Sequence, residues 1–96
     1  MSDEKLKVEF RTQFRRDVKR LEKQHKIMIQ LFTAIDWISN RDPLPDRFRD
    51  HALTGNWINH RECHIGPDWL LIYRIDNEKL ILICVRTGSH AELGLK

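Results

Sequence analysis

The apolar residues of this 96-residue chain change their spacing twice, and this change limits the folds that the chain can adopt. Leu6, Val8 and Phe10 alternate with charged residues, which predicts a strand at residues 6–10 with one buried face. From Phe10 onwards the apolar spacing becomes helical, and it predicts a helix at residues 11–24 whose other faces are basic.

A second helix is predicted at residues 27–39, where Met28, Leu31 and Ile35 follow the helical period. Its only charged residue is Asp36, so we expect this helix to be the more buried of the two. The short connection between the helices predicts an antiparallel helical hairpin.

The second half of the chain returns to the spacing that is typical of strands. Residues 40–56 contain prolines, a glycine and alternating charges, which predicts a loop, and a loop of this length in a small domain is usually functional. Three runs of strand-forming residues follow, at residues 59–65, 69–75 and 80–86. Their connections are too short for helical crossovers, so we expect an antiparallel meander and, after Gly88, at most one helical turn.

The resulting order of elements, β-α-α-β-β-β with a short helical tail, predicts the α+β class. We expect a single domain over residues 1–96, in which the helical hairpin packs on one face of an antiparallel sheet. The opposite face is expected to be open to a partner or a polymer. A domain of this size has no room for a large enclosed cofactor, and no cofactor is predicted.

Basic residues are concentrated in the first helix. The chain carries a formal charge of +3, but residues 5–26 hold nine basic and three acidic residues, whereas residues 57–96 hold five of each. This separation predicts a docking surface for an anionic partner, although a solvated helix face is the simpler alternative. The residues of this surface are Arg11, Arg15, Arg16, Lys19, Arg20 and Lys23.

Composition also excludes several classes of protein. Two cysteines, Cys63 and Cys84, are too few for a disulfide framework. The first residues lack the apolar segment of a signal peptide and no stretch is long enough to cross a membrane, so a cytoplasmic location is expected. Adjacent strand residues such as Cys63 and His64 point to opposite faces, and no pair has the spacing of a zinc site, so no metal is predicted.

Histidines lie close to the predicted strand ends. Since the apolar residues of the first meander strand should face the helices, Glu62 and His64 face the open side. His51 ends the long loop, Asp68 lies in a turn and His90 follows the last strand, so these residues can converge with His64 at one edge. Histidines beside a carboxylate suit general acid–base chemistry near neutral pH, such as RNA cleavage by internal transfer.

The same residues also have purely structural interpretations. His51 can hydrogen-bond the loop backbone, His64 can be a half-buried strand residue, and Asp68 can be a turn former. The sequence by itself leaves both interpretations open.

Other residues are candidates for holding a substrate. The guanidinium of Arg86 matches the geometry of a phosphate, and the ring of Trp69 is a candidate for stacking on a base. Trp37 and Trp57 are instead predicted to lie in the core.

Three phrases of the sequence carry a resemblance to a known family. They are DHALTGNW at residues 50–57, RECHIGPDWLLIY at residues 61–73 and RTGSH at residues 86–90. With the order of elements, they resemble the YafQ branch of the RelE/ParE toxin superfamily over nearly the whole chain. This resemblance implies a toxin of a bacterial type II toxin–antitoxin system that enters the ribosomal A site and cuts translated mRNA without a metal.

The resemblance also implies partners and site residues. The partners are the ribosome, mRNA and a cognate antitoxin; operator DNA is contacted only through the antitoxin, and no membrane is involved. The implied catalytic residues are His51, His64, Asp68 and His90. The implied substrate-binding residues are Arg86, Trp69 and Arg61.

One part of the sequence departs from the family pattern. YafQ-like chains often end with an aromatic residue shortly after the last histidine, whereas residues 90–96 read HAELGLK. The tail therefore offers no ring for base stacking, although the histidines remain. Two other functions stay open: a ParE-like inhibitor of DNA gyrase without catalysis, and a non-catalytic module that binds RNA or protein.

Overall fold

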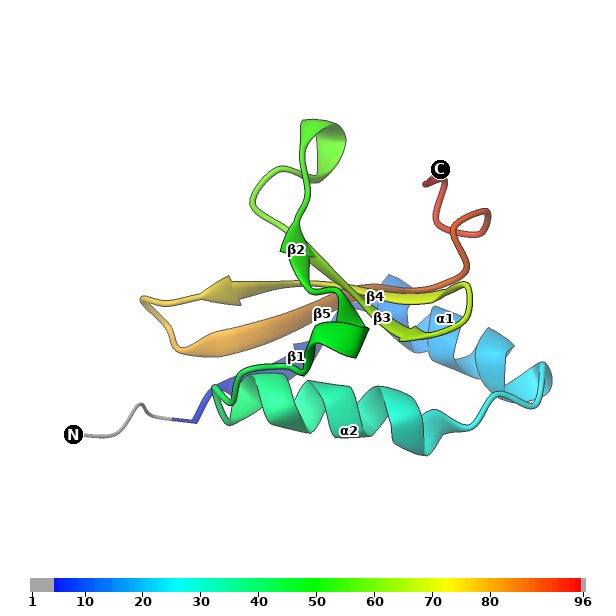
Figure 1. Ribbon diagram of the computed structural model, residues 1–96, viewed down its shortest axis with the longest axis horizontal. Helices are drawn as coiled ribbons and strands as arrows, with labels where there is room; N and C mark the ends of the chain where they lie inside the picture. The colour runs from blue at the N-terminus through cyan, green and yellow to red at the C-terminus, as the bar shows by residue number, and fades with distance from the viewer. Residues whose placement is uncertain (1–4, 96) are drawn as a thin grey trace.

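Strand β1 (Lys7–Phe10) lies at one edge of a five-stranded sheet in the computed structural model, which describes residues 5–95 (Figure 1). It is followed by helices α1 (Thr12–Lys23) and α2 (Met28–Ser39). The later strands are β2 (His51–Ala52), β3 (Arg61–Gly66), β4 (Trp69–Asp76) and β5 (Ile81–Gly88). Two 3₁₀ turns, η1 (Asp46–Phe48) and η2 (Gly55–Trp57), flank β2. The predicted α+β class is confirmed, and the predicted loop at residues 40–56 contains η1, β2 and the start of η2.

The sheet has the order β1-β5-β4-β3-β2 and is mixed. Strands β3, β4 and β5 form the predicted antiparallel meander, and β2 extends it with His51 opposite Glu62. β1 instead pairs in parallel with β5, where Phe10 lies opposite Cys84. The prediction of a wholly antiparallel sheet is therefore wrong at this edge, because the two helices carry the chain across one face before it returns.

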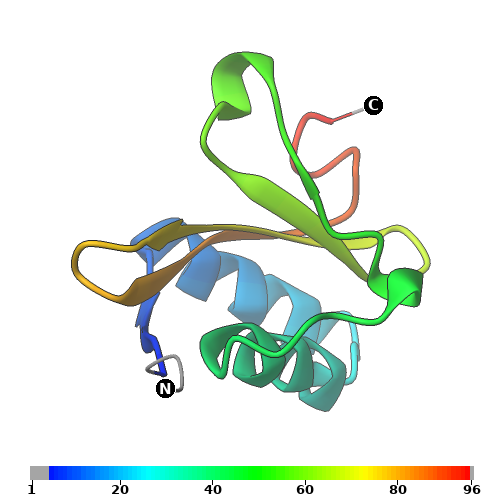
Figure 2. The same ribbon diagram turned by 60° about the vertical axis from the view of Figure 1, so that its left-hand side comes forward.

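Both helices cover the same face of the sheet, and the chain reverses direction between them (Figures 1 and 2). Their apolar stripes form the main core with the inward residues of the strands. This core includes Phe14, Leu21, Leu31, Ile35, Cys63, Leu71, Leu82 and Cys84. α2 buries five residues and α1 three, which confirms that α2 is the more buried helix.

One carboxylate is buried where α1 meets the end of β5. Asp17 is 0% exposed and accepts hydrogen bonds from Nε and Nη2 of Arg86 at 2.7 and 3.1 Å. It also accepts bonds from Nη1 of Arg20 at 2.8 Å and from the backbone N–H of Thr87 at 3.1 Å. Burial by itself would raise the pKa of Asp17, but these hydrogen bonds outweigh it and hold the pKa below its usual value. Asp17 is therefore ionised and fastens α1 to β5.

The sheet face opposite the helices is partly covered, so the prediction of an open face is wrong. Leu70 and Ile72 of β4 are buried there with Leu93 of the tail, and Leu53 and Trp57 pack against them. Figures 1 and 2 show the segment around η2 and the C-terminal tail standing above the sheet. Both segments fold back over this face and bury a second, smaller apolar cluster.

The solvent side of α2 is unusually apolar. Ile29 is 70% exposed, Phe32 is 40% exposed and Trp37 is 37% exposed. The prediction that Trp37 lies in the core is therefore wrong, because the buried stripe of α2 is formed by residues such as Leu31 and Ile38. Neither helix of the described residues is long and apolar enough to cross a membrane.

Candidate active site

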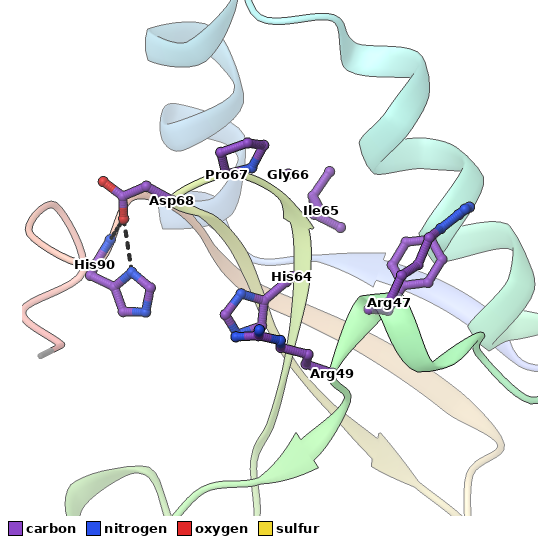
Figure 3. Close-up of a pocket in the computed structure, with 9 residues that line it drawn as sticks. Arg47, Arg49, His64, Ile65, Gly66, Pro67, Asp68 and His90 are labelled. Atoms are coloured by element: carbon purple, nitrogen blue, oxygen red, sulfur yellow. Dashed lines mark hydrogen bonds and ion pairs between the residues drawn. The ribbon is translucent and has the colours of Figure 1, made fainter.

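A surface cavity of about 590 Å³ lies where the β3–β4 turn, η1 and the tail after β5 meet (Figure 3). His64, Asp68 and His90 line this cavity. The ring centroids of His64 and His90 are 6.0 Å apart, and that of His51 lies 6.4 Å from His64. The structure thus gathers the four residues that the sequence singled out. The other residues lining the cavity are Arg47, Phe48, Arg49, Ile65, Gly66 and Pro67.

The turn between β3 and β4 places Asp68 against His90. Oδ1 of Asp68 accepts hydrogen bonds from the backbone N–H of His90 at 2.9 Å and from its Nδ1 at 2.8 Å (Figure 3). The backbone bond, followed by the ring bond, lowers the pKa of the Asp68 carboxyl. Because an ionised carboxylate only accepts hydrogen bonds, Nδ1 of His90 carries a proton and Nε2 is left for a substrate.

A tight turn after β5 brings His90 to this position. Gly88 has a φ of +154°, and a Cβ there would lie 2.7 Å from Nη2 of Arg20, so another residue would be both strained and crowded. Glu92 accepts the backbone N–H of Ser89 at 2.9 Å, and Ser89 Oγ accepts that of Glu92 at 3.0 Å. The predicted helical turn is therefore a single hydrogen-bonded turn.

His64 is half-buried at the end of β3, and its environment disfavours the charged ring. Burial lowers the pKa of His64; the carboxylate of Glu62 opposes this effect, and the guanidinium of Arg49 adds to it. His64 is therefore a neutral imidazole near neutral pH, and a neutral imidazole can accept a proton.

Glu62 is part of this site, although the sequence suggested only its face and no role. It is 5% exposed, and its Oε2 lies 3.4 Å from Nε2 of His51 and 3.6 Å from Nε2 of His64. Nδ1 of His51 lies 2.7 Å from the backbone oxygen of Arg49. The i, i+2 spacing of Glu62 and His64 was the available signal, whereas the approach of His51 depends on β2, which is too short to recognise.

The predicted substrate-binding residues are held by other groups of the protein. Trp69 is 3% exposed and its Nε1 donates to Oγ1 of Thr87 at 3.0 Å, so the prediction that it stacks on a base is wrong. Arg86 is held by Asp17, and Arg61 donates to the carboxylate of Asp50 at 3.2 and 3.1 Å. Neither guanidinium lines the cavity.

Of the six basic residues that were predicted to form a docking surface on and just before α1, one is held within the protein. Arg20 donates hydrogen bonds to Asp17 and, at 3.1 Å, to the backbone oxygen of Thr87, and it forms an ion pair with Glu92 at 3.0 Å, so it joins α1 to the tail. The other five predicted residues are exposed: Arg11, Arg15, Arg16, Lys19 and Lys23.

No group of three or more His, Cys, Asp or Glu residues within residues 5–95 is arranged to hold a metal ion. Cys63 and Cys84 are free and buried. Burial raises the pKa of Cys84 to about 12 and also raises that of Cys63. Both groups are therefore neutral thiols near neutral pH, and the ionisable chemistry at the cavity belongs to its histidines and carboxylates.

Comparison with known proteins identifies the family of this chain. The family described as "Bacterial toxin of type II toxin-antitoxin system, YafQ" matches residues 6–94. The mRNA interferase toxin YafQ of Escherichia coli (strain K12) is 40% identical over 87 residues, which cover 90% of this chain and 92% of that protein.

Two solved structures are also similar. The matched chain of the E. coli DinJ-YafQ toxin–antitoxin complex has a TM-score of 0.84 and 38% identity, covering 93% of this chain and 97% of that chain. A metal-bound toxin from Helicobacter pylori has a TM-score of 0.87 and 36% identity, covering 92% and 98%. The chain therefore belongs to the YafQ family of bacterial toxins of type II toxin–antitoxin systems.

Proposed function

We propose that this toxin is an mRNA interferase, an endoribonuclease that cuts translated mRNA in the ribosomal A site by metal-independent acid–base chemistry. The observation that carries the proposal is that His64, Asp68 and His90 line one cavity, with His51 and Glu62 grouped beside His64. The name of the 40% identical E. coli relative supports the same activity. Such chemistry needs only the side chains that the site contains, and the ribosome would present the mRNA to them.

The two best-placed histidines are proposed to share the proton transfers. Neutral His64 takes the proton of the RNA 2′-hydroxyl, and the 2′-oxygen attacks the adjacent phosphorus. The bond from phosphorus to the 5′-oxygen breaks, and His90, protonated on Nε2 and oriented by Asp68, gives its proton to that oxygen. The products are a 2′,3′-cyclic phosphate and a 5′-hydroxyl. Glu62 lies beside Nε2 of His64 and links it to His51.

An antitoxin is the second proposed partner. The E. coli relative is seen in complex with DinJ, and the exposed basic residues of α1 are suited to an acidic antitoxin segment that folds on binding. The same residues can approach ribosomal RNA through salt-dependent phosphate contacts. The antitoxin and the ribosome would then compete for α1, in a bacterial cytoplasm, and operator DNA would be met only through the antitoxin.

Primer extension on a defined mRNA, translated in a purified system with the toxin, tests the proposed activity. We expect new 5′ ends within the coding region that appear only when ribosomes translate the message. Intact transcripts accompanied by gyrase-dependent DNA breaks would instead identify a ParE-like inhibitor. Intact transcripts with undamaged DNA would instead indicate a non-catalytic module that binds RNA or protein.

Glu62→Gln is expected to shift the pH dependence of cleavage. Glu62 opposes the lowering of the His64 pKa, so its removal lowers that pKa further. Protonation of His64 stops it from acting as a base. In the variant this protonation occurs at a lower pH, so the acidic limb of the rate profile moves to a lower pH. The rate on the plateau should fall by less than the roughly 100-fold that the loss of a catalytic acid or base costs.

A pH profile of single-turnover cleavage measures both effects. Glu78→Gln removes the same charge from an exposed turn and should leave the profile unchanged. An acidic limb that stays in place, or moves to higher pH, would contradict the role given to Glu62.

A further inference from the structure

The proposed chemistry needs a cation beside the reacting phosphate, and the expected one is not available. The guanidinium of Arg86 is bound by Asp17 through Nε at 2.7 Å and Nη2 at 3.1 Å. Arg61 is similarly bound by Asp50. Turning either guanidinium to a phosphate would break two hydrogen bonds to a carboxylate and remove a cation that balances its charge, so another group is better placed to meet the charge of the RNA.

Arg49 is a cation at the cavity whose guanidinium is held by no other group of the described residues. It lines the cavity with His64 and His90, and its side chain is exposed. Among the described residues no carboxylate or other acceptor is bonded to its guanidinium. Figure 3 shows this side chain reaching across beside the ring of His64. Its charge is also close enough to lower the pKa of that ring, which agrees with the placement.

The backbone of Arg49 also takes part in the site, through an uncommon conformation. Arg49 ends η1 with φ 47° and ψ 43°, a left-handed conformation that costs energy for any residue other than glycine. In this conformation its carbonyl oxygen meets Nδ1 of His51 at 2.7 Å. One residue therefore positions a histidine through its backbone and offers a guanidinium through its side chain.

We propose that Arg49 binds the scissile phosphodiester of the RNA, with its guanidinium on the non-bridging oxygens between His64 and His90. This inference rests on the proposed endoribonuclease function and adds the anion-binding group to it. A guanidinium matches two phosphate oxygens at once, and its attraction increases as negative charge builds on those oxygens during attack. Arg49 should therefore act on the rate of cleavage more than on the affinity for the ribosome.

The neighbouring Arg47 gives an internal comparison. It lines the same cavity, but its guanidinium carbon lies 4.6 Å from the centroid of the Phe48 ring, and Figure 3 shows it directed away from His64. Charge near the cavity is thus available from both residues, whereas only Arg49 is aimed at the histidines. Their variants separate a specific phosphate contact from general attraction to RNA.

The test compares Arg49→Gln, Arg49→Lys and Arg47→Gln in single-turnover cleavage of a defined mRNA on ribosomes, at saturating toxin. Arg49→Gln should lower the rate by about 10²–10³-fold, as does the loss of one donor from an anion-stabilising site. Arg49→Lys should recover part of that rate, since lysine keeps the positive charge but cannot donate two parallel hydrogen bonds to the phosphate. Arg47→Gln should lose less, and Arg74→Gln, remote on β4, should match the wild type.

Binding of inorganic phosphate to the free toxin gives a readout that does not need activity. In an NMR titration, phosphate should shift the ring signals of His64 and His90, and Arg49→Gln should weaken this binding by about tenfold. Arg49→Gln should also raise the pKa of His64, which the same spectra measure. Thermal unfolding verifies that each variant is folded.

The outcomes separate this inference from the function on which it rests. If the wild type leaves mRNA intact, the proposed endoribonuclease function is wrong. The phosphate titration then tests separately whether Arg49 binds an anion. A wild type that cleaves, with Arg49→Gln within about threefold of it, overturns the inference and keeps the function. Equal losses in Arg49→Gln and Arg47→Gln overturn it as well, because they indicate attraction to RNA in general.

Discussion

His90→Ala is expected to lower the rate of mRNA cleavage by about 10²–10⁴-fold, the range that a general acid or base contributes. His64→Ala should have an effect of the same size. The proposed reaction has one proton to remove and one to deliver, and each variant deletes the group that handles one of them. Single-turnover cleavage on ribosomes measures the rate, and growth after induction shows whether inhibition is lost.

The controls for this result are folding, antitoxin binding and a third histidine. Both substituted rings lie at the cavity rather than on α1, so binding of the antitoxin should persist in both variants. His60→Ala removes a partly exposed ring that is bonded to the backbone oxygen of Ile58 and packed on Trp57, away from the cavity, and this variant should cleave normally. Undiminished growth inhibition by both variants would remove these histidines from the mechanism.

Asp17→Asn is expected to destabilise the protein by about 3–5 kcal/mol, the usual cost of removing one partner from a buried ion pair. The change removes the negative charge that Arg86 and Arg20 share, and its side chain is 0% exposed. Domains of this size are stable by roughly 5–15 kcal/mol, so the variant would be close to unfolding. Urea denaturation gives the free energy directly.

The pH dependence of stability provides a second measurement on Asp17. Its pKa is lower in the folded protein than in the unfolded chain, so its contribution is fully present above the unfolded value of about 3.9. The contribution is lost as pH falls from there through the folded pKa. Asp17→Asn should abolish that part of the acid-induced loss.

A surface carboxylate serves as the matched control for this variant. Asp42→Asn removes an equal charge at an exposed position, and its effect should stay within about 0.5 kcal/mol. A loss of less than about 1 kcal/mol for Asp17→Asn would mean that water replaces the carboxylate and that the buried network is not essential.

The helices and the meander could be predicted from the sequence because their apolar periods are local. The position of β1 could not, since its pairing with β5 joins residues more than seventy positions apart and depends on how the helices cross the sheet. β2 has only two residues, too few to show any period. Its pairing nevertheless decides where His51 lies.

The histidines of the candidate site could be predicted from the sequence, whereas the contacts of the residues around them could not. His64, Asp68 and His90 lie at strand ends whose convergence follows from the meander. Phosphate-binding chemistry suggested Arg86, but its partner is Asp17, 69 positions away, and no local pattern reveals such a pair. For Trp69 the ring was recognised, while its burial depends on packing that the sequence does not display.

The cavity is built mostly from segments at the margin of the sheet, and this has a consequence for how such toxins can diversify. His64, Ile65 and Gly66 come from the end of β3, whereas the other walls belong to η1 and the residue after it, the turn between β3 and β4, and the tail. Exposed positions on these walls can change with little effect on the free energy of unfolding. If the proposed activity holds, substitutions on these walls can alter the preference for an RNA sequence without changing the core that supports the histidines.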